Sequence, residues 1–408
     1  MAEPTAAADA AHEHIDVIED REGYLAALEV LRAGHGPIAI DAERASGFRY
    51  SQRAYLIQVY RRGAEVFLFD PIAIGDMSEL GELGREEEWV LHAASQDLAC
   101  LREVGIHPVR LFDTELGARL AGLPRVGLGT VVQELLGIHL AKEHSAADWS
   151  TRPLPQAWLV YAALDVELLV DVRDAVAGLL EEQGKVEAAA QEFQAVLDRE
   201  TPVRQDPWRR LSGIHGIRSQ RILAVAKSLW ETRDAYAREI DTAPGRLVPD
   251  ASLVNAAKAN PASKRELAAL REFTGRASRS QIDRWWGAIE AGRAMEDLPA
   301  IRVPGDGPPP PRAWADKNPE ADARLKAARP AVQAVAEELG LPVENLLTPD
   351  LLRRLAWTPP EVHDRESIAA ALAALGARPW QIDATAQAIA QSFVDGPQEP
   401  PEPVEPAS

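Results

Sequence analysis

The sequence has little that could cross-link it or anchor it in a membrane. It contains a single cysteine, Cys100, which excludes an intramolecular disulfide and zinc sites built from several cysteines. Its apolar runs are far shorter than the roughly 20 residues that a membrane-spanning helix requires. The first residues do not place a basic segment before an apolar core, so we expect no secretory signal. These absences favour a cytoplasmic protein with no membrane partner.

The chain also lacks positive charge overall, although not in every region. Its 408 residues carry 44 Lys and Arg against 63 Asp and Glu, which gives a net charge of −19. Taken alone, this acidic surplus argues against binding a polyanion. Residues 201–300, however, hold 17 basic and 12 acidic side chains, whereas residues 1–200 hold 17 and 35. A basic segment inside an acidic protein is typical of a module that binds a polyanion.

The pattern of apolar residues divides the chain into an α/β part and two helical parts. Short apolar runs at 37–43, 54–60, 65–70 and 89–94 indicate strands, the second and third of them forming a hairpin, and helical spacing dominates afterwards. Four consecutive prolines mark a stiff linker between the helical parts. We expect a flexible N-terminus at 1–22, an α/β domain at 23–202, a basic helical unit at 203–297, a Pro-rich linker at 298–316, a second helical unit at 317–396 and a disordered tail at 397–408.

Two acidic residues stand at the end of the first predicted strand. Because side chains alternate along a strand, Asp41 and Glu43 point to the same face. Two neighbouring carboxylates repel each other, and a hard divalent cation would remove that repulsion. The ordinary alternative is a pair of surface acids just past a strand end.

Three more polar residues follow later elements. Asp97 comes just after the strand at 89–94, where a helix begins. The simple alternative for it is an ordinary carboxylate at a helix N-terminus, where the helix dipole stabilises negative charge. Tyr161 and Asp165 are four residues apart on a predicted helix and therefore share a face. The simple alternative for this pair is a structural hydrogen bond.

The order and spacing of these residues resemble a known family. IAIDAE, LHAASQDL and YAALD are similar to the three motifs of the DEDD 3′–5′ exonucleases that carry tyrosine in the last motif. The block K-x-x-S-x-x-D-W-x-x-R-P-L, from Lys142 to Leu154, resembles the ribonuclease D family. The sequence on both sides of this block resembles the same family almost without interruption. The two helical units resemble the HRDC domains, the helicase-and-RNase-D C-terminal modules, that follow the exonuclease domain in this family.

The resemblance implies a fold and a mechanism. The fold is a ribonuclease-H-like α/β exonuclease domain, with a mixed sheet of about five strands, followed by two all-α HRDC-like domains. Asp41, Glu43, Asp97 and Asp165 would hold two divalent ions, Mg²⁺ or Mn²⁺, and Tyr161 would orient the attacking water. The implied reaction is hydrolysis of RNA from a free 3′-OH to nucleoside 5′-monophosphates. The implied partner is RNA with a single-stranded 3′ end, such as a tRNA precursor, and we expect a monomer.

Several basic residues are candidates for contact with the substrate. Arg44 stands where the family usually carries an apolar or aromatic residue, so it either reaches a substrate phosphate or is an exposed arginine. Lys142, His144 and Arg152, in the D-W block, could contact phosphate, and the arginine or lysine could instead tie this loop to the acids.

In the basic helical unit, Arg218, Arg221 and Lys227 cluster near the start of a long predicted helix. Such side chains could hold backbone phosphates without reading sequence, or they could form a solvated helix face. Trp285 and Trp286 could stack on bases, although tryptophan at a helix start is usually core.

Two alternatives stay open at the level of the sequence. One is a 3′–5′ DNA exonuclease in repair, because no residue can be identified that reads the 2′-OH. The other is a catalytically inactive nucleic-acid-binding protein, although a pure binding module gains nothing from four clustered acids.

Overall fold

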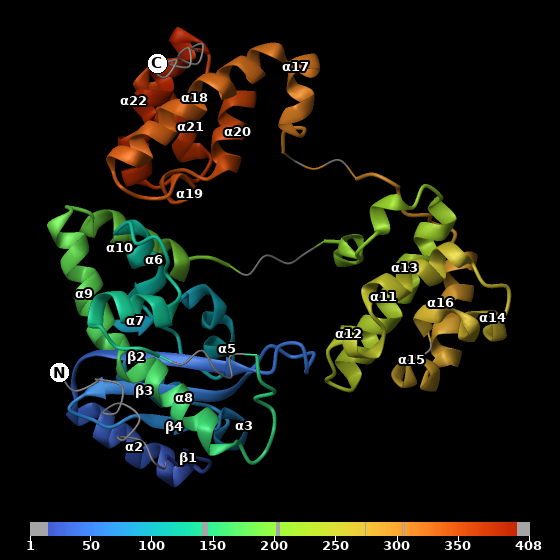
Figure 1. The fold of residues 1–408 in the computed structure, drawn as a ribbon, viewed down its shortest axis with the longest axis horizontal. Coiled ribbons are helices and arrows are strands. Elements are labelled where there is room, and N and C mark those ends of the chain that lie inside the picture. The colour runs from blue at the N-terminus through green and yellow to red at the C-terminus, as the bar shows by residue number, and fades with distance from the viewer. Residues whose placement is uncertain are drawn as a thin grey trace, which may run out of the picture.

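The computed structural model describes residues 15–140, 146–200, 205–273, 275–303, 305 and 307–397. Figure 1 shows an N-terminal α/β domain, a middle helical unit and a C-terminal helical unit. Within these described ranges, no helix is long and apolar enough to cross a membrane. The tail from 398 onwards, for which we expected disorder, lies outside them.

A six-stranded mixed sheet with the strand order β1-β4-β3-β2-β5-β6 forms the centre of the N-terminal domain. The central strand β2 pairs antiparallel with β3 and parallel with β5, and β3 and β4 form the expected hairpin. All six buried positions at the start of β3 are apolar or glutamine, which is why this strand lies in the middle of the sheet. The strands are β1 (Val17–Ile18), β2 (His35–Arg44), β3 (Ala54–Arg62), β4 (Phe67–Phe69), β5 (Trp89–Leu91) and β6 (Leu111–Asp113).

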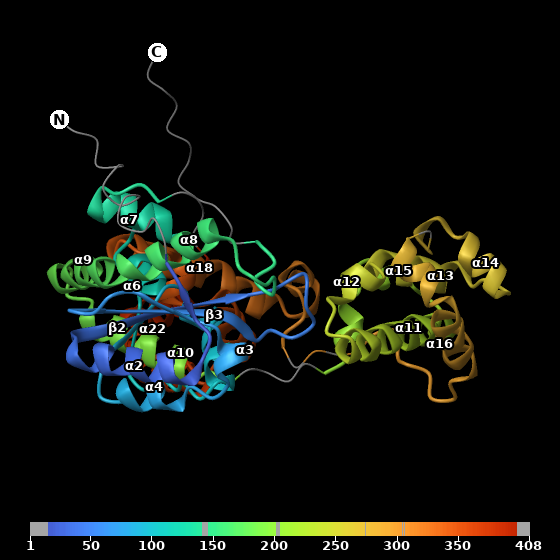
Figure 2. The same cartoon turned by 90° about the horizontal axis from the view of Figure 1, so that it is seen from below.

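Helices cover both faces of this sheet. Helix α8 packs on β2 and β3, and Figure 2 shows α2 on the opposite side of these strands. Helices α9 and α10 continue from α8 and pack against β5 and β6. The helices of the domain are α2 (Arg21–Ala33), α3 (Pro71–Ile74), α4 (Ser78–Leu83), α5 (Leu98–Glu103), α6 (Thr114–Leu120), α7 (Leu128–Leu136), α8 (Gln156–Glu167), α9 (Leu169–Glu182) and α10 (Val186–Leu197), with the 3₁₀ turn η1 (Ala94–Gln96) before α5.

The middle unit is all-helical and has its own core. Trp208, Phe273 and Trp285 are buried at its centre, so Trp285 is a core residue, whereas Trp286 is half-buried beneath Arg293. Its elements are η2 (Pro207–Arg210), η3 (Ile214–Gly216), α11 (Gln220–Glu239), α12 (Pro244–Leu247), α13 (Asp250–Ala259), α14 (Lys264–Ala269), η4 (Arg271–Phe273), α15 (Arg276–Ser280) and α16 (Ile282–Ala294).

The C-terminal unit is a second helical body with a separate core. Trp314 is buried against Trp357, with ring centroids 5.0 Å apart. The elements are η5 (Pro311–Ala313), α17 (Trp314–Lys317), α18 (Pro319–Glu338), α19 (Val343–Leu346), α20 (Pro349–Trp357), α21 (Arg365–Ala374) and α22 (Pro379–Asp395).

Two of the expected boundaries need correction. The segment 1–22 is not flexible throughout, because β1 pairs with β4 and α2 already begins at Arg21. The linker 298–316 ends early, since η5 and α17 belong to the C-terminal unit through the buried Trp314. In both cases a short apolar element gains its stability from tertiary packing and carries too little periodicity to be recognised alone.

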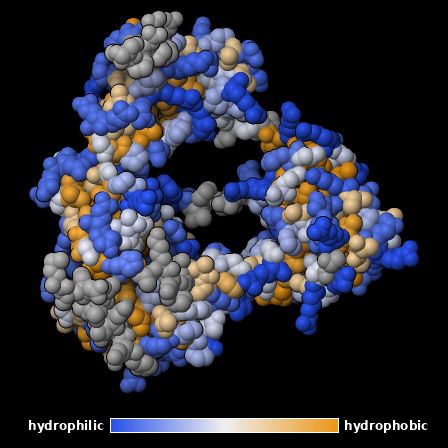
Figure 3. Space-filling model, in the orientation of Figure 1, coloured by the Kyte–Doolittle hydropathy of each residue, from blue (hydrophilic) through white to orange (hydrophobic). Residues whose placement is uncertain are grey.

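Both helical units contact the N-terminal domain, and Figure 3 shows the three bodies around an opening. In the C-terminal unit, Trp380 donates from its indole to buried Glu192 of α10 at 2.7 Å, and Arg378 pairs with the same carboxylate. The middle unit contacts the loop 45–53 between β2 and β3, where Ala243 N donates to Phe48 O at 3.0 Å. Tyr50 of the same loop donates to Asp234 near the end of α11 at 3.1 Å, so the last turns of α11 lie beside a loop that follows directly from β2.

Candidate active site

A cavity of about 480 Å³ opens beside the end of β2, between η1, α7 and α8. Its polar lining comes from strands and helices that are far apart in the sequence. These side chains are Asp41, Glu43, Arg44, His92, Gln96, Asp97, Glu115, Tyr161 and Asp165. The cavity thus collects all five residues that the exonuclease motifs single out.

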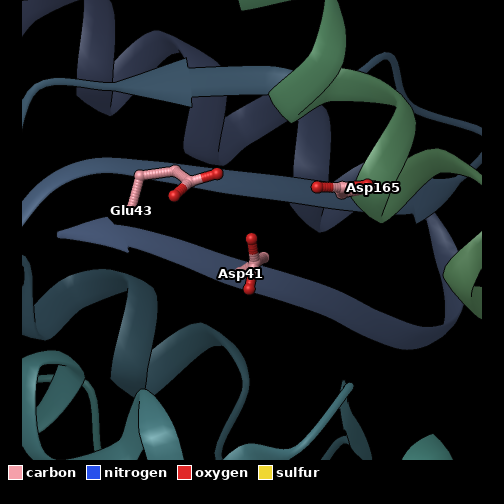
Figure 4. A group of neighbouring side chains, drawn as sticks. All are labelled: Asp41, Glu43 and Asp165. Atoms are coloured by element: carbon pink, nitrogen blue, oxygen red, sulfur yellow. The ribbon is translucent and has the colours of Figure 1, made fainter. Parts of the chain in front are cut away.

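Three carboxylates form the centre of this cavity. Asp41 and Glu43 lie on the face of β2 that α8 covers, and Asp165 projects from α8 toward them (Figure 4). One oxygen from each of the three carboxylates lies within 4.8 Å of the others. Tyr161, one turn before Asp165, is hydrogen-bonded to it. The period of two in the strand and the spacing of four in the helix produce this convergence.

The electrostatics of the cluster favour a bound cation. Burial, with repulsion from Asp41, Asp165 and Asp97, raises the pKa of Glu43 to about 10. Burial and the charge of Asp41 raise the pKa of Asp165 to about 8, and burial also raises the pKa of Asp41. Without a cation, Glu43 and Asp165 therefore retain protons at neutral pH. A set of hard oxygen donors with this repulsion fits Mg²⁺ or Mn²⁺.

Asp97 lies at the start of α5 in the same cavity, outside the three-carboxylate group. Burial and Asp41 raise its pKa well above the usual range. A tight turn places it, because Ala93 has a φ of 60° and the Asp113 carboxylate accepts from the backbone N–H groups of Ala93 and Ala94 at 3.1 and 2.9 Å. Asp113 is a positioning residue that the sequence reasoning missed. Its signal was an aspartate at a strand end that also caps a helix.

Arg44 is part of the cavity and not an exposed arginine. Its Nη2 lies 3.3 Å from Oδ1 of Asp97, and its side chain is 24% exposed. The pairing of β2 with β3 shifts register between Glu43 and Arg44, where β3 carries one extra residue, Tyr55. Alternation along β2 alone did not predict that the Arg44 guanidinium would reach this cavity.

The remaining predicted substrate contacts in the described part of the chain do not line this cavity. Lys142 and His144 lie outside the described residues. Arg152 has structural partners, in line with the alternative that it ties its loop to the rest of the domain. It donates to Asp70 Oδ2 at 2.7 Å, to Trp149 O at 2.9 Å and to Tyr55 O at 2.8 Å, and thereby ties its loop to β3.

Two of the three cations predicted in the middle unit also have structural partners. Arg221 donates to the carbonyl of Arg293 at 2.9 Å, and Lys227 pairs with Glu231 at 3.7 Å. Arg218 stays exposed, and among the described residues its guanidinium donates to His215 O at 3.4 Å. The sequence could not separate these cases, because the carbonyl partner of Arg221 lies 72 residues away.

His92, the residue after β5, lines the cavity. Burial lowers its pKa to about 4, so the imidazole is neutral at pH 7. Its Nδ1 lies 2.9 Å from Thr114 Oγ1, which holds the ring in place. Gln96 and Glu115, which the motifs do not single out, also line the cavity.

Comparison with protein families defines the class of this fold and site. Residues 15–181 match a family model described as "3'-5' exonuclease". Residues 222–289 match the HRDC domain, and residues 307–393 match a model described as "3' to 5' exonuclease C-terminal domain". The protein is thus built as a 3′–5′ exonuclease with two helical domains behind the nuclease domain. The predicted fold is confirmed.

Comparison with individual proteins identifies the family within this class of exonucleases. The chain is 32% identical to ribonuclease D of Gluconacetobacter diazotrophicus over 67% of its own length and 71% of the relative's. It resembles the structure of Escherichia coli RNase D with a TM-score of 0.69 and 26% identity, covering 94% of this chain and 100% of that one. A protein from Bifidobacterium adolescentis is similar with a TM-score of 0.86 and 36% identity, covering 93% and 97%. The chain belongs to the ribonuclease D family.

Proposed function

We propose that the protein is a metal-dependent 3′–5′ exoribonuclease that removes nucleotides from a free 3′-OH and releases nucleoside 5′-monophosphates. The observation that carries the proposal is the convergence of Asp41, Glu43 and Asp165, with Asp97 in the same cavity and Tyr161 beside them. Family membership supports the same reaction class.

In this proposal Asp41, Glu43, Asp97 and Asp165 hold two divalent ions, Mg²⁺ or Mn²⁺. When bound, such ions lower the pKa of a water and stabilise the leaving 3′ oxygen. Tyr161 positions the attacking water through its hydroxyl, while Asp165 holds that hydroxyl in place. The chain contributes positioning and charge, and no covalent nucleophile is needed.

The residues of the site do not distinguish RNA from DNA, so the assignment of RNA as the substrate rests on the relatives. The E. coli relative is described as an exoribonuclease involved in structured RNA processing. We extend this to a structured RNA with a single-stranded 3′ tail, such as a tRNA precursor. A monomeric enzyme in the cytoplasm remains our prediction for its state and location.

Digestion of a 5′-labelled RNA hairpin with a 3′ tail, with Mg²⁺, Mn²⁺ or EDTA, tests the proposal. We expect stepwise shortening from the 3′ end with either ion, no product in EDTA, and protection of the same RNA by a 3′-phosphate. The Asp165→Asn variant should give no product. A matched DNA hairpin that is shortened faster than the RNA would assign the protein to DNA. Binding without product under any ion would identify an inactive binding protein.

A further inference from the structure

A buried glutamine lies behind the metal-binding carboxylates. Gln58 occupies the middle of β3, whose first six residues are all buried, and it is 0% exposed. Its neighbours Ile57 and Val59 are apolar and equally buried. Burying an amide without full hydrogen bonding destabilises the folded state, so a glutamine here calls for an explanation.

The register of the sheet places Gln58 directly beside Asp41. The two residues are cross-strand partners, so their side chains leave the sheet on the same face. Gln58 Nε2 lies 3.4 Å from Asp41 Oδ2 and donates to it. The Asp41 carboxylate is otherwise held by a backbone hydrogen bond from Ala42. Gln58 does not line the cavity, so any effect on the reaction must pass through Asp41.

The carbonyl end of the Gln58 amide does not stabilise the fold through a hydrogen bond. Gln58 Oε1 is buried and has no hydrogen-bond partner among the described residues. The side chain therefore carries the cost of an unsatisfied acceptor while its donor end serves a single carboxylate. A leucine of similar volume would avoid that cost, because the surroundings on β3 are apolar.

We propose that Gln58 is a positioning residue that orients the Asp41 carboxylate for the divalent cation. This inference rests on the proposed function, since it needs a cation at Asp41. Residues that hydrogen-bond to a metal ligand fix its orientation, and their loss typically weakens metal affinity or activity by about 10- to 100-fold. Stability and metal affinity should therefore respond to a change at Gln58 in opposite directions.

The test is a Mn²⁺ titration of the full chain, followed by electron paramagnetic resonance, on the wild type, Gln58→Leu and Asp41→Asn. We expect Gln58→Leu to raise the Mn²⁺ dissociation constant by about 10- to 100-fold. Its melting temperature in EDTA, followed by circular dichroism, should equal or exceed that of the wild type. Gln58→Met, which keeps an unbranched side chain, repeats the test if the leucine variant does not fold.

Gln381 provides a matched control, because it is also 0% exposed but lies in α22 of the C-terminal unit. Both ends of its amide are bonded, with Nε2 donating to Asn345 O and Oε1 accepting from Arg378 N, each at 3.1 Å. Gln381→Leu should lower the melting temperature and leave the Mn²⁺ affinity unchanged.

The outcomes separate this inference from the proposed function. Wild-type Mn²⁺ affinity in Gln58→Leu, with Asp41→Asn weakened, overturns the role of Gln58 and leaves the metal site intact. A loss of stability in Gln58→Leu that matches Gln381→Leu, without a change in affinity, shows that Gln58 is structural. If Asp41→Asn binds Mn²⁺ as tightly as the wild type does, Asp41 is not a metal ligand. This result would refute the proposed metal site and, with it, the proposed role of Gln58.

Discussion

Replacing Asp241 by alanine should weaken the docking of the loop 45–53 on the middle helical unit. Asp241 follows α11, and its carboxylate accepts from Ser51 N at 2.8 Å and from Arg53 Nη2 at 2.9 Å. The Tyr55 hydroxyl donates to the same carboxylate at 3.3 Å. One side chain of the middle unit thus holds three positions around the turn from β2 to β3. The loop begins directly after Arg44, a residue of the candidate active site.

The contacts set the size of the expected effect. A hydrogen bond from a backbone N–H to a carboxylate contributes about 1.5–3 kcal/mol. Arg53 is 45% exposed, so its ion pair adds at most about 1 kcal/mol. We therefore expect Asp241→Ala to cost about 2–3 kcal/mol of loop docking. Since 1.4 kcal/mol is a factor of ten in an equilibrium, the undocked loop should become about 30- to 100-fold more populated.

Hydrogen exchange measured by mass spectrometry on peptides that cover 45–53 checks this prediction. The matched control is Asp283→Ala in the same unit, since the Asp283 side chain is 80% exposed and pairs with Lys264 at the surface. Protection of the loop should fall in Asp241→Ala and stay unchanged in the control. Unchanged loop protection in Asp241→Ala, or an equal loss along the whole of α11, would refute the reasoning.

The pH dependence of loop docking follows from the same contacts. Burial raises the pKa of Asp241, but the hydrogen bonds from Ser51 and Arg53 outweigh it and lower the pKa to about 2. A lowered pKa stabilises the docked state above the ordinary value of 3.8, and this contribution is lost as the pH falls toward 2. Loop protection should therefore be insensitive to pH between about 5 and 8.

Three further predictions concern the carboxylate cluster. Asp41→Asn should reduce the single-turnover rate of RNA trimming with Mn²⁺ at least about 100-fold. The same variant should have a higher melting temperature than the wild type in EDTA, because it removes a repelling charge. The pKa values of Glu43 and Asp165 are raised to about 10 and about 8, so the folded metal-free protein binds more protons than the unfolded chain above about pH 4. Its stability should therefore fall from pH 5 to 9 in EDTA and fall less with Mn²⁺, as followed by thermal unfolding. Arg44→Ala should tighten Mn²⁺ binding about 3- to 10-fold in a titration, because it removes a competing cation from Asp97, and unchanged or weaker binding would contradict this role.

Much of the site could be predicted because each motif depends on a local period. Alternation in a strand placed Asp41 and Glu43 together, and a spacing of four in a helix placed Tyr161 beside Asp165. The strand and helix patterns likewise predicted an α/β domain followed by helical units, as the structure confirms. Short elements such as β1 were not predicted, because two residues are too few to show a periodic pattern.

The sequence by itself determined which residue types the cluster contains and which face of each element they occupy, since both depend on neighbours within a turn or a strand. Tertiary structure alone decided the uses of the other polar residues. It paired Arg44 with Asp97, tied Arg152 to Asp70, and brought Gln58 behind Asp41. These partners are 17 to 82 residues apart, and a local pattern contains no information about contacts over such separations.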